Sequence, residues 1–158
     1  MFREMRRAKQ ALSEDECRQI LKTEKRAVLS LIGDGGWPYG LPVNYFYDEK
    51  ENCLYIHGGK HGHKIDSIRA CNKVSFTVYD KGTKYPGDWA YHVKSVIAFG
   101  ESELIDDVAI AEEKVRELAL RFYPDPQEAE RELRSGIKSV MLIKIRIVHM
   151  TGKIIHER

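Results

Sequence analysis

Two long stretches of the sequence alternate between apolar and other residues with the period of two that a β-strand requires. In Trp89–Ile105, one face carries Ser95 together with the apolar residues Tyr91, Val93, Ile97 and Phe99. The second stretch begins at Met141 and continues through Gly152 to Ile155, and one of its faces carries Met141, Ile143, Ile145 and Ile147. A helix would scatter these residues around its axis, so the pattern requires a sheet built on two long strands.

Shorter segments predict the rest of the sheet. The turn Gly33-Asp34-Gly35-Gly36 predicts a hairpin between its flanking segments, because glycine permits the positive φ of a tight turn. Pro38 and Pro42 cannot donate hydrogen bonds to a neighbouring strand, so we expect them at a sheet edge or at bulges. The predicted shorter strands are Ala27–Ile32, Trp37–Tyr47, Leu54–His57 and Lys73–Tyr79.

Four helices are predicted, one before the first of these strands and three between later ones. Ser13 and Glu16 have the spacing of a capping box, and Ile65 and Ile68 are spaced as on one face of a helix. The predicted helices are Ser13–Lys22, His63–Ala70, Asp106–Arg121 and Gln127–Arg134. About six mostly antiparallel strands with inserted helices favour a mainly β fold, a barrel or split β-barrel, because closure removes exposed sheet edges.

Length and charge exclude several classes of protein. The 158 residues suit one domain, 1–158, and 26 Lys and Arg against 24 Asp and Glu give a net charge of only +2. This balance does not favour nucleic-acid binding, and we expect Arg3, Arg6 and Arg7 to form a solvated or dimer-contacting arm. With no apolar stretch of about 18 residues and no secretory signal, no membrane partner is expected and the predicted location is cytoplasmic. Three widely spaced cysteines predict reduced thiols.

The segment Leu54–Arg69 predicts a site for an anion. A strand ends in glycines, passes two lysines and enters a helix, so unpaired backbone N–H groups and positive charge come together. A solvated basic turn that only caps the helix explains the same residues equally well, and Asp66 in the first turn of the helix weakens the case for an anion. The residues expected to form the site are Gly58, Lys60, Gly62 and Lys64.

Neighbouring residues leave other chemistry open. His57, His61 and His63 form an H-x3-H-x-H pattern, but no carboxylate or cysteine completes a recognisable set of metal ligands, so no metal is predicted. Hydrogen bonding near an anion, or half-buried packing of His57, is a simpler role. The aromatic segment Trp37–Tyr47 is suited to stack on a flat heterocycle or to pack in a core, and Asn44 is its best hydrogen-bonding member. No nucleophile motif supports hydrolysis.

Several blocks of residues together resemble one known family. They are M-F-R-E-M-R-R, V-L-S-L-I-G-D-G-G-W-P-Y-G-L-P-V-N-Y, Y-I-H-G-G-K-H-G-H-K-I-D-S-I-R, S-V-I-A-F-G and the closing H-M-T-G-K. Because these blocks occur in the order of that family, the chain resembles the flavin-binding split-barrel proteins related to pyridoxamine phosphate oxidase. Within this family it resembles the nitroimidazole-resistance proteins. The resemblance extends over nearly the whole chain.

This resemblance implies a homodimer of split barrels of antiparallel Greek-key type, with FMN, less often FAD, in clefts at the subunit interface. It implies that Gly62, His63 and Lys64 hold the phosphate and that Ser95 contributes a hydroxyl. The residues implied to line the isoalloxazine ring are Pro42, Val43, Asn44 and Tyr45. His57 would stand near the redox centre as a substrate-orienting or proton-donating residue.

The chemistry implied is that of an FMN-dependent oxidoreductase. NAD(P)H would reduce the flavin, which would reduce a small electron-poor molecule such as a 5-nitroimidazole. A flavin-binding carrier or redox sensor without turnover is the alternative, and a different planar cofactor, haem or deazaflavin, is a third possibility. The chain departs from the family in D-W-A-Y-H-V-K before S-V-I-A-F-G, where we expect His92 and Lys94 to face outward, so the shape of the substrate stays open.

Overall fold

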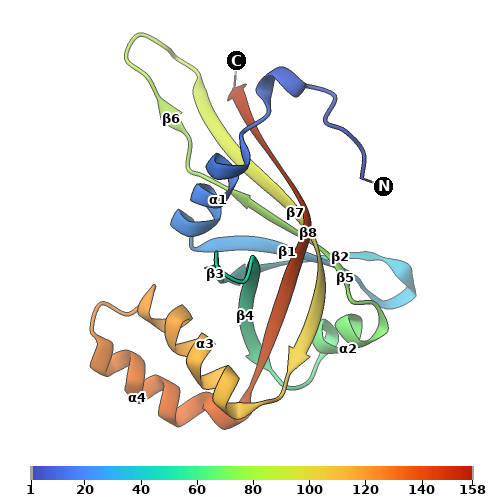
Figure 1. Cartoon of the computed structure of the whole chain (residues 1–158), viewed down its shortest axis with the longest axis vertical. Coiled ribbons are helices and arrows are strands. Elements are labelled where there is room, and N and C mark those ends of the chain that lie inside the picture. The colour runs from blue at the N-terminus through green and yellow to red at the C-terminus, as the bar shows by residue number, and fades with distance from the viewer. Residues whose placement is uncertain (1, 158) are drawn as a thin grey trace.

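The computed structural model describes residues 2–157, which fold around a curved antiparallel sheet (Figure 1). This eight-stranded sheet has the order β2-β1-β5-β7-β8-β4-β3, and β6 pairs with β7 outside that path. The strands are β1 Arg26–Ile32, β2 Pro38–Asn44, β3 Phe46–Asp48, β4 Cys53–Gly59, β5 Lys73–Tyr79, β6 Thr83–Lys84, β7 Tyr91–Ile105 and β8 Val140–Glu157. The helices are α1 Glu14–Thr23, α2 His63–Ala70, α3 Val108–Leu120 and α4 Pro126–Gly136, with short 3-10 turns at η1 Ala8–Gln10, η2 Asp34–Gly36 and η3 Ile137–Ser139.

The two long alternating segments form β7 and β8, as predicted, and they pair with each other along nearly their whole length. On β8, alternate residues of Met141–Ile147 are buried in the main core, as the period of two requires. On β7, the core side carries the smaller residues Val96 and Ala98. The larger apolar residues of β7, such as Ile97 and Phe99, are exposed on the opposite face of the strand.

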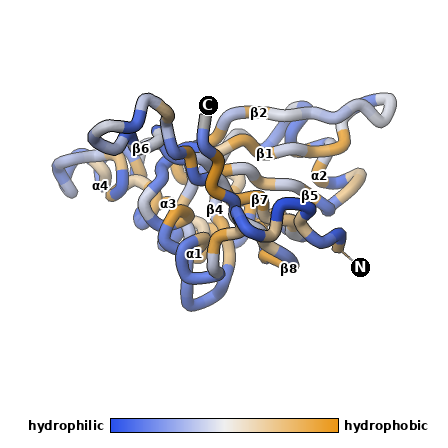
Figure 2. Tube along the Cα trace, turned by 90° about the horizontal axis from the view of Figure 1, so that it is seen from above, coloured by the Kyte–Doolittle hydropathy of each residue, from blue (hydrophilic) through white to orange (hydrophobic). Residues whose placement is uncertain are grey.

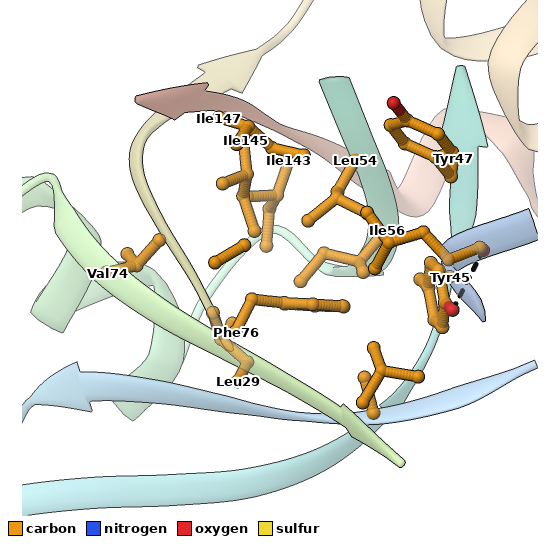
Figure 3. Close-up of a cluster of buried hydrophobic side chains, with 14 of the residues drawn as sticks. Leu29, Tyr45, Tyr47, Leu54, Ile56, Val74, Phe76, Ile143, Ile145 and Ile147 are labelled. Atoms are coloured by element: carbon orange, nitrogen blue, oxygen red, sulfur yellow. Dashed lines mark hydrogen bonds between the residues drawn. The ribbon is translucent and has the colours of Figure 1, made fainter. Parts of the chain in front are cut away.

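The core fills the concave side of the sheet, which curls into a half-barrel (Figures 1 and 3). Phe76 and Tyr45 meet edge to face there, with ring centroids 5.1 Å apart. Helix α1 closes one end, and its Leu21 is fully buried. A capping box between Ser13 and Glu16 begins this helix, as the spacing predicts. Figure 2 shows hydrophobic positions along the strands in the middle of the molecule and largely hydrophilic positions along the outer loops.

Helices α3 and α4 form a hairpin outside the barrel, beside β4 and β8 (Figure 1). A second cluster of buried residues joins them to the sheet: Cys53, Tyr55, Ala111, Val115, Leu133 and Leu142. The buried Lys114 of α3 adds two ion pairs, at 2.8 Å to Asp48 and 2.8 Å to Glu51. These contacts fix α3 against the β3–β4 hairpin.

Arg121, just after α3, links the helical hairpin to the first half of the chain. Its guanidinium donates to the backbone carbonyls of Tyr45 at 3.2 Å, Lys22 at 2.8 Å and Glu24 at 2.8 Å. The same group lies 5.5 Å from the centre of the Tyr45 ring. Burial lowers the pKa of Arg121. One side chain therefore holds the end of α3, the end of α1 and the junction between β2 and β3 in a fixed arrangement.

The sheet differs from the prediction in its number of strands. The segment Trp37–Tyr47 is interrupted at Tyr45, because β2 pairs with β1 whereas β3 pairs with β4 on the far edge of the sheet. The short β6 was not predicted either. Pro38 and Pro42 lie on β2, an edge strand, as expected. None of the helices within residues 2–157 has the length and apolar character needed to cross a membrane.

Candidate functional site

The bend Gly58–Lys64, which runs from the end of β4 into the start of α2, places an unpaired lysine amine against a glycine. A Cβ added to Gly58 would collide with the Nζ atom of Lys64 and lie 3.1 Å from its Cε. Lys64 is half-buried, and this burial lowers the pKa of its amine. No carboxylate among residues 2–157 forms an ion pair with it. A partly desolvated cation without a counter-charge is a favourable position for an anion.

The start of α2 adds backbone donors to this bend. Gly62 precedes the helix with φ +106°, a conformation that favours glycine, and no side chain caps the helix. The Gly62 carbonyl accepts from the N–H groups of Ile65 and Asp66. The preceding N–H groups of His63 and Lys64 have no acceptor within the described chain. Together with the helix dipole, they form an anion-binding element.

Two side chains predicted for the anion site have other partners. Lys60 Nζ pairs with Asp106 at 3.1 Å, just before α3. The His63 ring stacks on Tyr39, with centroids 4.2 Å apart, and accepts a hydrogen bond from the Asp34 N–H at 3.3 Å. His63 can therefore contribute its backbone N–H to the site, whereas its ring fixes α2 to the β1–β2 hairpin.

An apolar cleft of about 440 Å³ lies beside the bend, between the sheet and the α3–α4 hairpin. His57 and Asn44 line it from β4 and β2. Most of the remaining lining comes from the two helices and the segments that follow them: Val115, Leu118, Ala119, Phe122, Tyr123, Glu132, Leu133, Gly136 and Ile137. Clefts of this size and composition commonly bind small molecules. Sequence spacing predicted both helices but gave no sign that they form this wall.

His57 connects the cleft to the anion-binding bend. His57 immediately precedes Gly58, the first residue of the bend, and it also lines the cleft. Partial burial of the ring, and to a lesser degree the Lys64 charge, lower the pKa of His57 below that of a free histidine. The lowered pKa favours the neutral imidazole at neutral pH, in which one ring nitrogen can donate and the other accept a hydrogen bond at the mouth of the cleft.

Of the four consecutive residues predicted to line a cofactor ring, Pro42, Val43 and Asn44 line one shallow pocket together with Arg26, whereas Tyr45 does not. Pro42 and Asn44 are exposed, and Val43 packs against the core. Tyr45 is fully buried, and its hydroxyl donates to the Leu21 carbonyl at 2.9 Å. Burial raises the pKa of Tyr45. The structure thus places Asn44 in the cleft and leaves the Tyr45 side chain in the core.

Ser95 lies far along β7 from the bend. It pairs with Tyr79, at the end of β5 opposite to α2. Near α2, Ser102 of β7 donates to the Asn72 carbonyl at 2.7 Å. Seven residues along a strand correspond to roughly 23 Å, so the structure does not bring Ser95 to the bend of its own chain.

The described residues give no support to a metal site or to a disulfide. No group of three or more His, Cys, Asp or Glu side chains in residues 2–157 is arranged to hold a metal ion. Cys17, Cys53 and Cys71 are free, and burial raises the pKa of the Cys17 and Cys53 thiols. Thiolate chemistry is therefore not favoured at either of these positions.

Comparison with known proteins decides the family. The sequence profile of the pyridoxamine 5'-phosphate oxidase family matches residues 13–154. The chain belongs to this family. No curated protein matches the sequence.

Solved structures of similar fold accompany this family match. One is a proposed 5-nitroimidazole antibiotic resistance protein from Bacteroides thetaiotaomicron, at a TM-score of 0.78 and 19% identity over 92% of this chain and 87% of that one. A FAD-binding protein from Mesorhizobium loti has a TM-score of 0.67 and 23% identity over 92% of this chain and 96% of that one. The flavocytochrome Anf3 from Azotobacter vinelandii has a TM-score of 0.70 and 19% identity over 96% of this chain and 72% of that one. At these identities the likeness shows the split-barrel fold, and it confirms the predicted fold class.

Proposed function

We propose that this member of the pyridoxamine 5'-phosphate oxidase family is an FMN-dependent oxidoreductase that reduces a small electron-poor molecule. The observation that carries the proposal is the half-buried Lys64 amine, which packs against Gly58 without a carboxylate partner and lies beside the uncapped start of α2. An anion would provide the partner that the Lys64 amine and the free N–H groups of α2 do not have within the chain. If this anion is the phosphate of a nucleotide, the attached ring system would lie beside the adjoining cleft.

The residues of the bend fit a flavin nucleotide. Lys64 and the N–H groups of His63 and Lys64 would hold the phosphate, and the closeness of Gly58 keeps the amine in place. Asn44 and His57 would face the ring system from the cleft. When bound, FMN supplies the redox chemistry, transferring electrons from NAD(P)H to the substrate.

His57 would orient the substrate or hold a proton for it. Its lowered pKa keeps the ring neutral, so that one ring nitrogen can donate and the other accept a hydrogen bond. A 5-nitroimidazole is the substrate class that we propose, because a neutral, planar heterocycle suits an apolar cleft of about 440 Å³ with two polar side chains on the sheet side.

We also propose that the functional unit is a homodimer. Tyr91, Ile97 and Phe99 form an exposed apolar row on the face of β7 that carries Ser95. Single exposed apolar residues are common on protein surfaces, but a row of them on one strand face is typical of an interaction site. A second copy of the chain would cover this row. Since Ser95 lies far from the bend of its own chain, its hydroxyl would serve the partner's site. Sedimentation velocity tests this point, and a monomer at micromolar concentration would contradict it.

The visible absorption spectrum of the purified protein, with mass spectrometry of any released small molecule, tests the cofactor. A flavin spectrum and the mass of FMN are expected. A colourless protein that also fails to bind added FMN would refute the proposal. A haem spectrum would show that the protein binds a different planar cofactor in place of FMN.

Turnover requires a separate measurement. Oxidation of NADH or NADPH by the FMN-loaded protein should accelerate when a 5-nitroimidazole is added. A yellow protein without such acceleration would instead be a flavin-binding carrier or sensor.

A further inference from the structure

We propose that the cleft selects neutral or cationic ring compounds and rejects anionic ones, including phosphorylated pyridoxamine, through the carboxylate of Glu132. This inference rests on the proposed function, because it makes the cleft the substrate site beside the flavin. It goes further by naming the charge class of the substrate and the residue that sets it.

The charge of the cleft is the first support. Glu132 of α4 is the only residue with a full charge among its lining residues, which otherwise are apolar or uncharged. No cation in residues 2–157 pairs with the Glu132 carboxylate, unlike Glu130, which pairs with Arg116 at 2.5 Å. An unpaired carboxylate at the wall of an apolar cleft attracts a cation and repels an anion.

The neutral state of His57 is the second support. A protonated histidine would offset the Glu132 charge, but burial and Lys64 lower the pKa of His57. Lys64 itself lies at the bend and does not line the cleft. In the proposed complex the phosphate of the nucleotide would match the charge of Lys64, so the residues that line the cleft offer no cation to a second phosphate.

The phosphate of pyridoxamine 5'-phosphate needs such cations. Lysine and arginine side chains are what proteins generally use to bind phosphate, and neither residue type lines this cleft. A family member with this cleft is therefore suited to other substrates than the one in the family's name.

Equilibrium binding of three nitrobenzene derivatives tests the inference without depending on turnover. At neutral pH, 4-nitrobenzylamine is cationic, 4-nitrobenzyl alcohol neutral and 4-nitrobenzoate anionic. Because a solvent-exposed ion pair contributes up to about 1 kcal/mol, the amine should bind up to about fivefold more tightly than the alcohol, and the benzoate should bind more weakly than the alcohol by a similar factor. Pyridoxamine 5'-phosphate should not compete with any of them.

Variants assign the selectivity to Glu132. In Glu132→Gln the three affinities should become equal within about twofold, whereas Glu117→Gln should leave the order unchanged, because Glu117 is an exposed residue of α3 outside the cleft. Ala119→Leu, which fills the cleft, should weaken all three compounds. Equal affinities in the unchanged protein, or an unchanged order in Glu132→Gln, would overturn the inference.

The same samples separate this inference from the proposed function. Their visible absorbance gives the flavin content, which depends on the bend and not on Glu132. A charge order that disappears in Glu132→Gln in a protein without flavin would support the selectivity and refute the proposed function. A yellow protein that reduces nitro compounds with no charge preference would refute the selectivity alone.

Discussion

Replacement of Gly58 by alanine should weaken FMN binding while the fold remains intact. The added Cβ would occupy the position of the Lys64 amine, so that this end of the side chain must move away from the bend. The obstacle is the far end of a flexible side chain and not backbone, so the neighbouring strands keep their positions. We expect the free energy of unfolding to change by less than about 1 kcal/mol.

The size of the binding effect follows from the interaction that is lost. A hydrogen bond between a charged donor and a phosphate contributes about 1.5–3 kcal/mol. Displacement of the Lys64 amine should therefore raise the Kd for FMN roughly 10- to 150-fold. Lys64→Met, which removes the charge and retains most of the side-chain volume, should have an effect of the same size.

Gly59 offers a matched control. A Cβ at Gly59 would have no atom within 4 Å, although this residue is the direct neighbour of Gly58 in β4. Gly59→Ala should therefore bind FMN like the unchanged protein. The double variant Gly58→Ala with Lys64→Met should bind no more weakly than either single variant, because both act on the same amine.

Titration of each variant with FMN, followed by quenching of flavin fluorescence, gives the Kd, and thermal unfolding gives the Tm. If Gly58→Ala binds FMN as tightly as the unchanged protein, the amine does not hold the phosphate. If Gly59→Ala is weakened to the same extent as Gly58→Ala, the effect comes from the strand and not from Lys64. Either result would refute the reasoning from which the proposed function starts.

Four further predictions concern charge and stability. Lys114→Met removes the buried amine that pairs with Asp48 and Glu51, although Glu51 keeps its ion pair with Lys144, and should lower the free energy of unfolding in urea by about 2 kcal/mol; a loss within experimental error would contradict the role of this ion cluster. Since hydrogen bonding to Lys114 lowers the pKa of Glu51 from 4.5 to about 2, the stability that Glu51 contributes is present above pH 4.5 and should be lost as the pH falls towards 2, as acid titration of the Tm would show. Lys64→Met should raise the pKa of His57 in an NMR titration without restoring the ordinary value, because burial remains. Ser13→Ala removes the capping box of α1 and should cost about 1 kcal/mol by urea unfolding, and an unchanged midpoint would argue against the cap.

Local patterns in the sequence predicted most of the fold. The segments 63–70 and 73–79 form a helix and a strand with the predicted bounds, because spacing and β-branched residues act over a few positions. Contacts between distant residues could not be predicted in this way. Lys60 pairs with Asp106 and His63 stacks on Tyr39, and no spacing rule connects such positions.

The candidate site was predictable in part. Glycines and lysines before a helix indicated the bend, and the structure brings Gly58 and Lys64 together there. Pro42, Val43 and Asn44 line one pocket, as expected of neighbouring members of a site, whereas the burial of Tyr45 depends on packing against α1 and β5 that local sequence does not indicate. The wall formed by α3 and α4 depends on tertiary packing, which only the structure reveals.

The position of β8 in the sheet has a consequence for synthesis of the chain. β8 is the last strand in sequence order, yet it lies between β7 and β4, near the middle of the sheet. Until residues 140–157 have left the ribosome, the edges of β7 and β4 that β8 will cover remain open to pairing with other chains. Until β8 joins the sheet, the nascent protein can therefore aggregate through these two open edges.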